Sequence, residues 1–128
     1  MFRLFLTIPV ILTACLKDET VSGFAETGAN FHLVEIDGTP FTARSTISFP
    51  DQGSVRGQAP CNAYSADQSA PYPWFALGPI AVTRAACDDL PKELLFFEAL
   101  SSMTQIEVFA DTVILRNDDM REMIFRAR

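Results

Sequence analysis

From residue 31 onward the sequence consists of short strand-like runs separated by turn residues every few positions. Runs of this kind cover residues 31–36, 46–49, 54–58, 74–77, 80–83, 106–109, 112–116 and 122–126. Asp37-Gly38 is typical of a hairpin turn, and other breaks are rich in Pro, Gly, Asn and Asp. Many short antiparallel strands commonly form sandwiches or barrels, because closure removes exposed edges. We therefore expect a mainly β, compact, antiparallel and barrel-like fold.

One segment has helical spacing instead. Between about residues 89 and 103, apolar residues recur three and four positions apart. Asp88 and Asp89 can accept hydrogen bonds from the first turn, and Pro91 fits that turn because its missing N–H is harmless there. The sequence thus predicts one α-helix before the C-terminal strands. Its apolar arc is broad, so we expect a largely buried helix whose apolar residues belong to the core.

The first fifteen residues are a separate unit. Arg3 supplies a positive charge, residues 4–12 are an apolar run, and Leu-Thr-Ala directly precedes Cys15. The run is shorter than the ~20 apolar residues of a membrane-spanning helix and has the layout of a secretory signal. A cysteine after Leu-Thr-Ala resembles a bacterial lipobox. This resemblance implies removal of the signal, residues 1–14, and diacylation of Cys15, whereas a chance cysteine or an uncleaved signal anchor is the alternative.

The remaining chain divides into a polar stretch and one domain. Residues 15–30 are small and polar without periodicity, which predicts a flexible tether, and residues 31–128 have the size of one domain. Leu16, rather than aspartate, follows the lipidated cysteine. By resemblance to lipoprotein sorting in enteric bacteria, this favours an outer-membrane lipoprotein of the cell envelope that faces the periplasm.

The charge of the chain limits its partners. The net charge is −6, and loss of Arg3 with the signal makes the mature chain one unit more acidic. An acidic surface disfavours nucleic acid and anionic lipid, so membrane attachment should come from the acyl chains. Acidity also suits a basic protein partner, although it serves solubility first. We expect a monomeric domain with an envelope protein as possible partner.

Two cysteines remain if Cys15 carries lipid. Cys61 and Cys87 would lie in an oxidising compartment, where paired thiols tend to become disulfides. Buried free thiols are one alternative, and redox or metal chemistry is another. The spacing is not Cys-x-x-Cys, and with His32 as the one histidine a zinc site lacks the usual four ligands. We expect a structural disulfide, no metal and no cofactor.

Two motifs resemble a known family. Cys-Asn-Ala-Tyr at 61–64 is followed by a strand that ends in Thr-Arg-Ala-Ala-Cys at 83–87, then by the helix and a hairpin. This order resembles the META domain, the HslJ-like heat-shock family, over most of residues 31–128. The resemblance implies a barrel-like domain with one helix, found in envelope lipoproteins and stress-related proteins, and no catalytic centre. The matching positions are Cys61, Asn62, Tyr64, Thr83, Arg84 and Cys87.

We expect structural roles for these positions. Asn62 suits a sharp bend by bonding its own backbone, and Tyr64 can bury its ring with the hydroxyl at the surface. Thr83 can offer its hydroxyl to a neighbouring carbonyl, and Arg84 can pair with an aspartate at the start of the helix.

The sequence lacks the patterns of common enzymes. There is no Gly-x-Ser-x-Gly elbow, phosphate loop or dinucleotide fingerprint, and a lone histidine is rarely a catalytic base. We therefore expect a non-catalytic, stress-related or protein-interaction module. The alternatives are an acidic inhibitor of a basic cell-wall hydrolase, a thiol oxidoreductase, and a binder of a small apolar ligand inside the barrel. The residues expected to line such a cavity are Phe49, Trp74, Phe75, Phe96 and Phe97.

Overall fold

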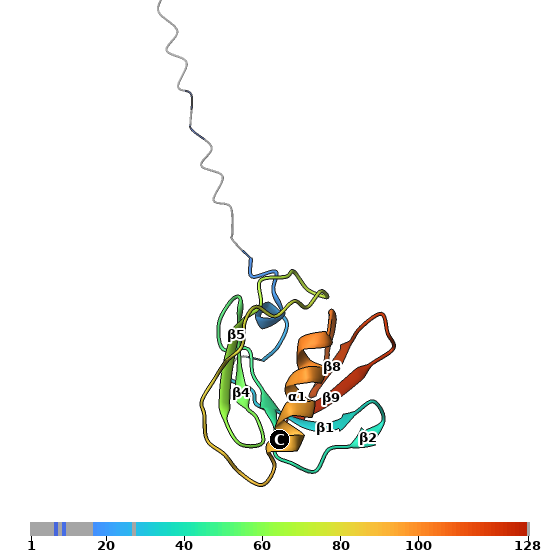
Figure 1. Cartoon of the computed structure of the whole chain (residues 1–128). Coiled ribbons are helices and arrows are strands. Elements are labelled where there is room, and N and C mark those ends of the chain that lie inside the picture. Colours follow the sequence, from blue (N-terminus) through green and yellow to red (C-terminus); the bar gives the residue numbers. More distant parts are fainter. Residues whose placement is uncertain (1–6, 8, 10–16, 27, 128) are drawn as a thin grey trace, which may run out of the picture.

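The structure is a computed structural model that describes residues 7, 9, 17–26 and 28–127 (Figure 1). The predicted cleavage site and Cys15 lie outside the described residues, so both remain predictions. Within the described part, no helix is long and apolar enough to cross a membrane.

The larger sheet is built from both ends of the domain. Its antiparallel order is β2-β1-β9-β8-β7, and β3 pairs with the start of β1. These strands are β1 (Phe31–Ile36), β2 (Thr39–Pro40), β3 (Thr46–Ile47), β7 (Gln105–Phe109), β8 (Thr112–Arg116) and β9 (Glu122–Ala127). Alternate residues of β8 and β9 point into the core, as the period of two in their sequences predicts. The predicted Asp37-Gly38 turn is confirmed, because both residues have the positive φ angles that such a hairpin needs.

A second sheet has three strands, β4 (Ser54–Gln58), β5 (Ala63–Asp67) and β6 (Ala81–Val82), in the order β4-β5-β6. An antiparallel bridge between Ser48 and Arg56 links it to the first sheet just after β3. No continuous strand pairing closes the two sheets on each other within the described residues, so a closed barrel is not present and the barrel-like part of the prediction is not confirmed. The segment between β5 and β6 contains Pro71, Pro73 and Pro79, which lack the N–H that a continuous strand needs. The predicted strand at 74–77 accordingly makes only isolated bridges.

The predicted helix is present as α1 (Leu90–Ser102). Pro91 lies in its first turn, but Asp89, at the N-cap, makes no side-chain cap bond. Phe96, Ala99 and Leu100 are buried. The expectation of a largely buried helix is wrong, because Leu94 and Leu95 are 66% and 59% exposed. The broad apolar arc contains one stripe for the core and a second stripe at the surface.

The core lies between the two sheets and α1. Its largest fully buried side chains come from every layer: Phe31, Ile47, Val55, Phe75, Phe96, Leu100, Ile106, Leu115, Met123 and Phe125. Phe49 is also buried in this cluster, and Phe97 packs against it. Trp74, in contrast, is 55% exposed. The phenylalanines expected to line a ligand cavity therefore fill the core, and Trp74 lies at the surface.

The segment predicted as a tether is docked on the domain from about Glu19 onward. Residues Val21–Gly23 form the short 3-10 helix η1, and Val21 is 2% exposed within the main core. The Tyr72 N–H donates to the Glu19 carbonyl over 2.7 Å, and the Phe24 ring stacks on that of Tyr72 at 4.1 Å. The described residues from Glu19 onward in the predicted tether are thus packed on the domain. A single helical turn is too short to produce periodicity in the sequence.

Candidate functional site

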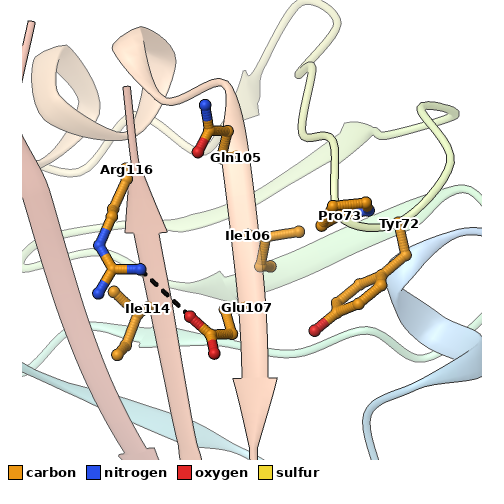
Figure 2. Close-up of a pocket in the computed structure, with 7 residues that line it drawn as sticks. All are labelled: Tyr72, Pro73, Gln105, Ile106, Glu107, Ile114 and Arg116. Carbon is orange, nitrogen blue, oxygen red and sulfur yellow. Dashed lines mark hydrogen bonds and ion pairs between the residues drawn. The ribbon is translucent and has the colours of Figure 1, made fainter. Parts of the chain in front are cut away.

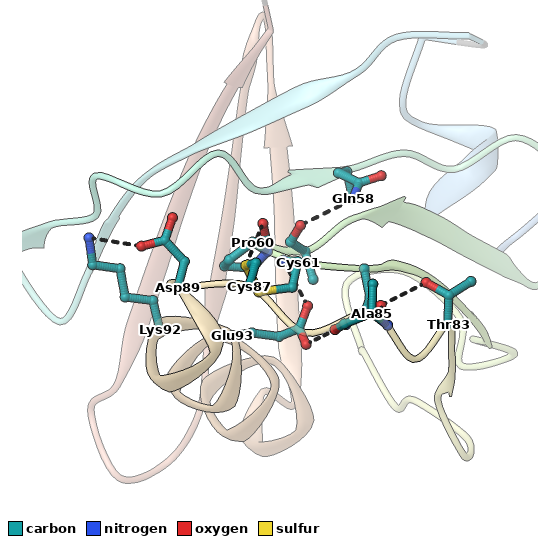
Figure 3. The surroundings of a disulfide bond; sticks show 11 residues. Gln58, Pro60, Cys61, Thr83, Ala85, Cys87, Asp89, Lys92 and Glu93 are labelled. Carbon is teal, nitrogen blue, oxygen red and sulfur yellow. Dashed lines mark hydrogen bonds and ion pairs between the residues drawn. A yellow bond between two sulfur atoms is a disulfide. The ribbon is translucent and has the colours of Figure 1, made fainter.

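The two sequence motifs meet at one place, between the end of β4, the segment after β6 and the first turns of α1 (Figure 3). Five residues make this contact, and we call them the motif cluster: Cys61, Asn62, Thr83, Cys87 and Glu93. The last of them lies on the inner side of α1, although the preceding aspartates were the acidic residues singled out from the sequence.

Asn62 is the centre of the cluster and is only 4% exposed. Its amide nitrogen donates to the Ala85 carbonyl at 3.0 Å and to Glu93 Oε2 at 2.8 Å. Its amide oxygen accepts from Thr83 Oγ1 at 3.0 Å and from the Ala85 N–H at 2.6 Å. All four hydrogen-bonding positions of the side chain are therefore used. The expected bond of Asn62 to its own turn is replaced by bonds to residues far along the chain.

Glu93 is equally buried, with 4% of its surface exposed. Oε1 accepts from the Cys61 N–H at 3.0 Å, and Oε2 accepts from Asn62. The ion pairs among the described residues do not include Glu93. This buried carboxyl group is thus stabilised by hydrogen bonds from neutral N–H groups. Removing either donor should therefore lower the stability of the fold, because a buried carboxyl oxygen would lose its partner.

The disulfide prediction is confirmed, because Cys61 and Cys87 are bonded with their Cα atoms 5.7 Å apart. The bond closes a loop of 26 positions. Residues 81–88, at the C-terminal end of this loop and one position beyond it, are all exposed. The segment is therefore held to the domain at one end by the disulfide and near its middle by Asn62, while its outer side faces solvent.

Tyr64 is buried deeper than expected. Only 4% of the residue is exposed, and its hydroxyl donates to the Thr46 carbonyl over 2.7 Å instead of reaching the surface. Phe96 and Phe97 contact its ring edge-on. Burial raises the pKa of the Tyr64 phenol well above its ordinary value of 10.0. Tyr64 is thus a structural residue that joins β5 to β3 and α1.

Thr83 makes a hydrogen bond of the expected kind, whereas Arg84 does not make the expected ion pair. The Thr83 hydroxyl donates to the Asn62 side-chain carbonyl and accepts from the Ala63 N–H at 3.2 Å. The expected pair between Arg84 and a helix-cap aspartate is absent from the ion pairs of the described residues, since Lys92 pairs with Asp89 instead, at 3.6 Å. Arg84 is exposed and lines a hollow beside the motif cluster.

That hollow has a volume of about 480 Å³, with Asn62 and Glu93 at its inner side and apolar residues around them. Val82 and Leu90 lie on its rim and are 36% and 39% exposed. Leu94 and Leu95 continue the apolar surface along α1. We call these four residues the leucine surface: Val82, Leu90, Leu94 and Leu95.

The sequence comparison decides the family. The model of the META domain matches residues 25–128, which is most of the chain. The chain belongs to the META domain family. The motif cluster is thus a feature of a META domain, and the resemblance inferred from residues 61–64 and 83–87 is confirmed. No curated protein matches the chain.

Solved structures share the META domain fold at low sequence identity. A protein from Burkholderia xenovorans, solved by NMR, has a TM-score of 0.65 at 18% identity, covering 84% of this chain and 86% of its own. A DUF4847 family protein from Bacteroides vulgatus has a TM-score of 0.59 at 11% identity, with coverages of 87% and 94%. A further NMR structure has a TM-score of 0.60 at 20% identity, with coverages of 77% and 87%. At these identities the likeness shows the fold alone.

A second hollow, of about 280 Å³, lies between the 72–73 segment and the outer face of β7 and β8 (Figure 2). Its charged groups bond each other, because Arg116 contacts Glu107 at 3.2 Å and Glu122 at 3.0 Å. The two charged residues of its lining, Glu107 and Arg116, are thus already paired with each other. Elsewhere in the described part of the META domain, no group of His, Cys, Asp and Glu is arranged to hold a metal ion.

Glu93 is the residue of the cluster that the sequence analysis missed. The signal was present, since Glu93 lies three and seven positions before Phe96 and Leu100 on the core stripe of α1. An acidic residue on a buried helical stripe needs donors, and these come from Cys61 and Asn62.

Proposed function

We propose that this META domain protein is a lipid-anchored, non-catalytic interaction module of the bacterial cell envelope, held at the outer membrane through Cys15 and facing the periplasm. The lipobox-like Leu-Thr-Ala-Cys supports the anchor, and the Cys61–Cys87 disulfide is consistent with an oxidising compartment. A role in stress response is the expectation that the family resemblance implies.

The leucine surface is the observation that carries the interaction. Leu94 and Leu95 are large, apolar and more than half exposed, and the exposed segment 81–88 extends the surface. Contiguous apolar patches on a soluble domain mark interaction sites. Exposed Asp88 lies just before α1, and exposed Glu98 lies on α1 and pairs with Arg121 at 2.6 Å. The chemistry fits a partner protein that presents an apolar patch with basic residues at its edge.

The saturated bonding of the motif cluster supports a function without catalysis. A catalytic group must reach a substrate atom. In the motif cluster, however, every hydrogen-bonding position of Asn62 is occupied by other groups of the protein. The two carboxyl oxygens of Glu93 accept from the Cys61 N–H and from Asn62. The cluster holds segment 81–88 and α1 in place, and thereby fixes the surface offered to a partner.

Crosslinking in intact envelopes tests the interaction. Wild-type protein should yield a specific crosslinked partner that is lost in Leu94→Asp. Met120→Asp is the matched control, because Met120 is 93% exposed but lies in the β8–β9 turn. Equal crosslinking by both variants would refute the leucine surface. Intact mass of the protein from the same envelopes tests the anchor, since an unacylated N-terminus contradicts it.

Inhibition of a basic cell-wall hydrolase is the second candidate, and the net negative charge of the chain favours it. Such inhibition should weaken with added salt and with Asp88→Lys, because screening reduces attraction between exposed charges. A hydrolase assay that shows no inhibition at low ionic strength would exclude it.

A further inference from the structure

A second exposed apolar surface lies where the described chain approaches Cys15. We call it the aromatic surface, and it consists of Phe24, Tyr72 and Trp74. Phe24 and Trp74 are 48% and 55% exposed, and the half-buried Tyr72 ring stacks on Phe24. In Figure 1 the loop that carries Tyr72 and Trp74, between the β5 and β6 strands, lies beside the blue N-terminal segment.

The connection between Cys15 and this surface is short. The Glu19 carbonyl is bonded to the Tyr72 N–H, so only four residue steps separate Cys15 from a fixed point beside the aromatic surface. Even fully extended, four steps span at most about 14 Å. A lipid on Cys15 therefore keeps the backbone of Tyr72 close to the membrane surface, because only these four steps and one hydrogen bond separate it from the acylated residue.

We infer that the aromatic surface rests in the head-group region of the membrane that anchors Cys15. The inference depends on the proposed acylation. Tryptophan and tyrosine favour this region, because their rings are apolar while their N–H and O–H groups remain hydrated. The domain is acidic overall, so the surface should prefer zwitterionic lipid over anionic lipid.

This contact gives the domain one orientation. In Figure 1 the blue segment that begins at residue 17 lies at one end of the domain, and the segment that leads into α1 lies at the other end. With the aromatic surface on the membrane, the segment that leads into α1 faces the aqueous compartment. The membrane contact and the beginning of the leucine surface then lie at opposite ends of the domain.

Trp74 reports on this contact directly, because it is the one tryptophan in the sequence. The test uses protein purified from envelopes, reconstituted in phosphatidylcholine vesicles with or without lipid brominated near the head group. The mass of the same sample states whether Cys15 is acylated. We expect Trp74 emission to shift to shorter wavelength and to be quenched strongly by the brominated lipid, and iodide in solution to quench it weakly.

Phe24→Ser should reduce the quenching by lipid, and Met120→Ser should leave it unchanged, with circular dichroism confirming that both variants are folded. Acylated protein whose Trp74 responds to iodide and not to brominated lipid overturns the inference and leaves the anchor intact. Protein without acyl chains overturns the anchor and this inference together, so the mass separates the two failures.

Discussion

The side-chain amide of Asn62 donates to the carboxyl group of Glu93 over 2.8 Å, and this bond joins the turn between β4 and β5 to the buried side of α1. The same two residues also hold Ala85 and the Cys61 N–H. One pair thus connects the small sheet, the exposed segment 81–88 and the helix. Because the pair is buried, changes of charge in it should be far more costly than the same changes at the surface.

Asn62→Asp should destabilise the domain strongly. The new carboxylate faces Glu93 inside the protein and leaves the Ala85 carbonyl without its donor. We expect a loss of about 3 kcal/mol in the free energy of unfolding, measured by urea denaturation at pH 7. The loss should shrink in acid, where a protonated carboxyl group donates again. Asn30→Asp, at an exposed position, is the control, and an equal loss in both variants would contradict the role of Asn62.

Replacement of both disulfide cysteines, Cys61→Ser with Cys87→Ser, should lower the free energy of unfolding by about 3–4 kcal/mol, because the open loop gains conformational entropy when unfolded. Denaturation of wild-type protein with and without reductant gives an independent value. The two values should agree, and a double variant as stable as the wild type would show that the bond contributes nothing.

Gly57→Ala should be poorly tolerated, although Gly57 lies in the regular strand β4. A Cβ there would meet the Thr46 carbonyl and approach the Tyr64 hydroxyl to 2.7 Å, in the middle of their hydrogen bond. We expect a loss of about 3 kcal/mol in thermal or chemical unfolding. Gly78→Ala is the control, since its nearest neighbour would be 3.7 Å away. Its unfolding curve should overlay that of the wild type.

Tyr64→Phe should reveal a pH dependence. The folded state raises the phenol pKa, so it favours the neutral form; the resulting stability is complete below the ordinary pKa of 10.0 and is lost as the pH rises above it. At pH 7 the variant should be about 1 kcal/mol less stable, because the bond to the Thr46 carbonyl is gone. Above pH 10 the wild type should lose about 1.4 kcal/mol per pH unit more than the variant. Parallel stability profiles of the two proteins between pH 9 and 11 would refute this account.

The sequence was most informative where a local rule decides the structure. The strand at 31–36, the hairpin strands 106–109 and 112–116, and the helix near 89–103 follow from periodicity and turn residues, and all are present. Strand β5 (Ala63–Asp67) is not among the predicted strands, because its short run Ala-Tyr-Ser-Ala-Asp contains one large apolar residue. In this strand Tyr64 and Ala66 are buried, whereas Ala63 and Asp67 are exposed.

The predictions differ from the structure where contacts between residues far apart in the sequence determine burial or hydrogen bonding. Whether Leu94 or Phe96 is buried depends on which stripe of α1 the sheets cover, and the helix sequence contains both. The partners of Asn62 lie more than 20 positions away, so no local pattern could name them. The docking of Val21 likewise depends on a core assembled from residues far along the chain.

The pairing of Phe31 with Ala127 has a consequence for the order of events during synthesis. β9 lies between β1 and β8, so β1 cannot pair with its main neighbouring strand until almost the whole domain has been synthesised. A nascent chain that stops short of residue 122 has no completed large sheet, and long-range closure of this kind slows folding. A chain that crosses a membrane in extended form would therefore remain unfolded during export and complete the large sheet only after residues 122–127 have crossed.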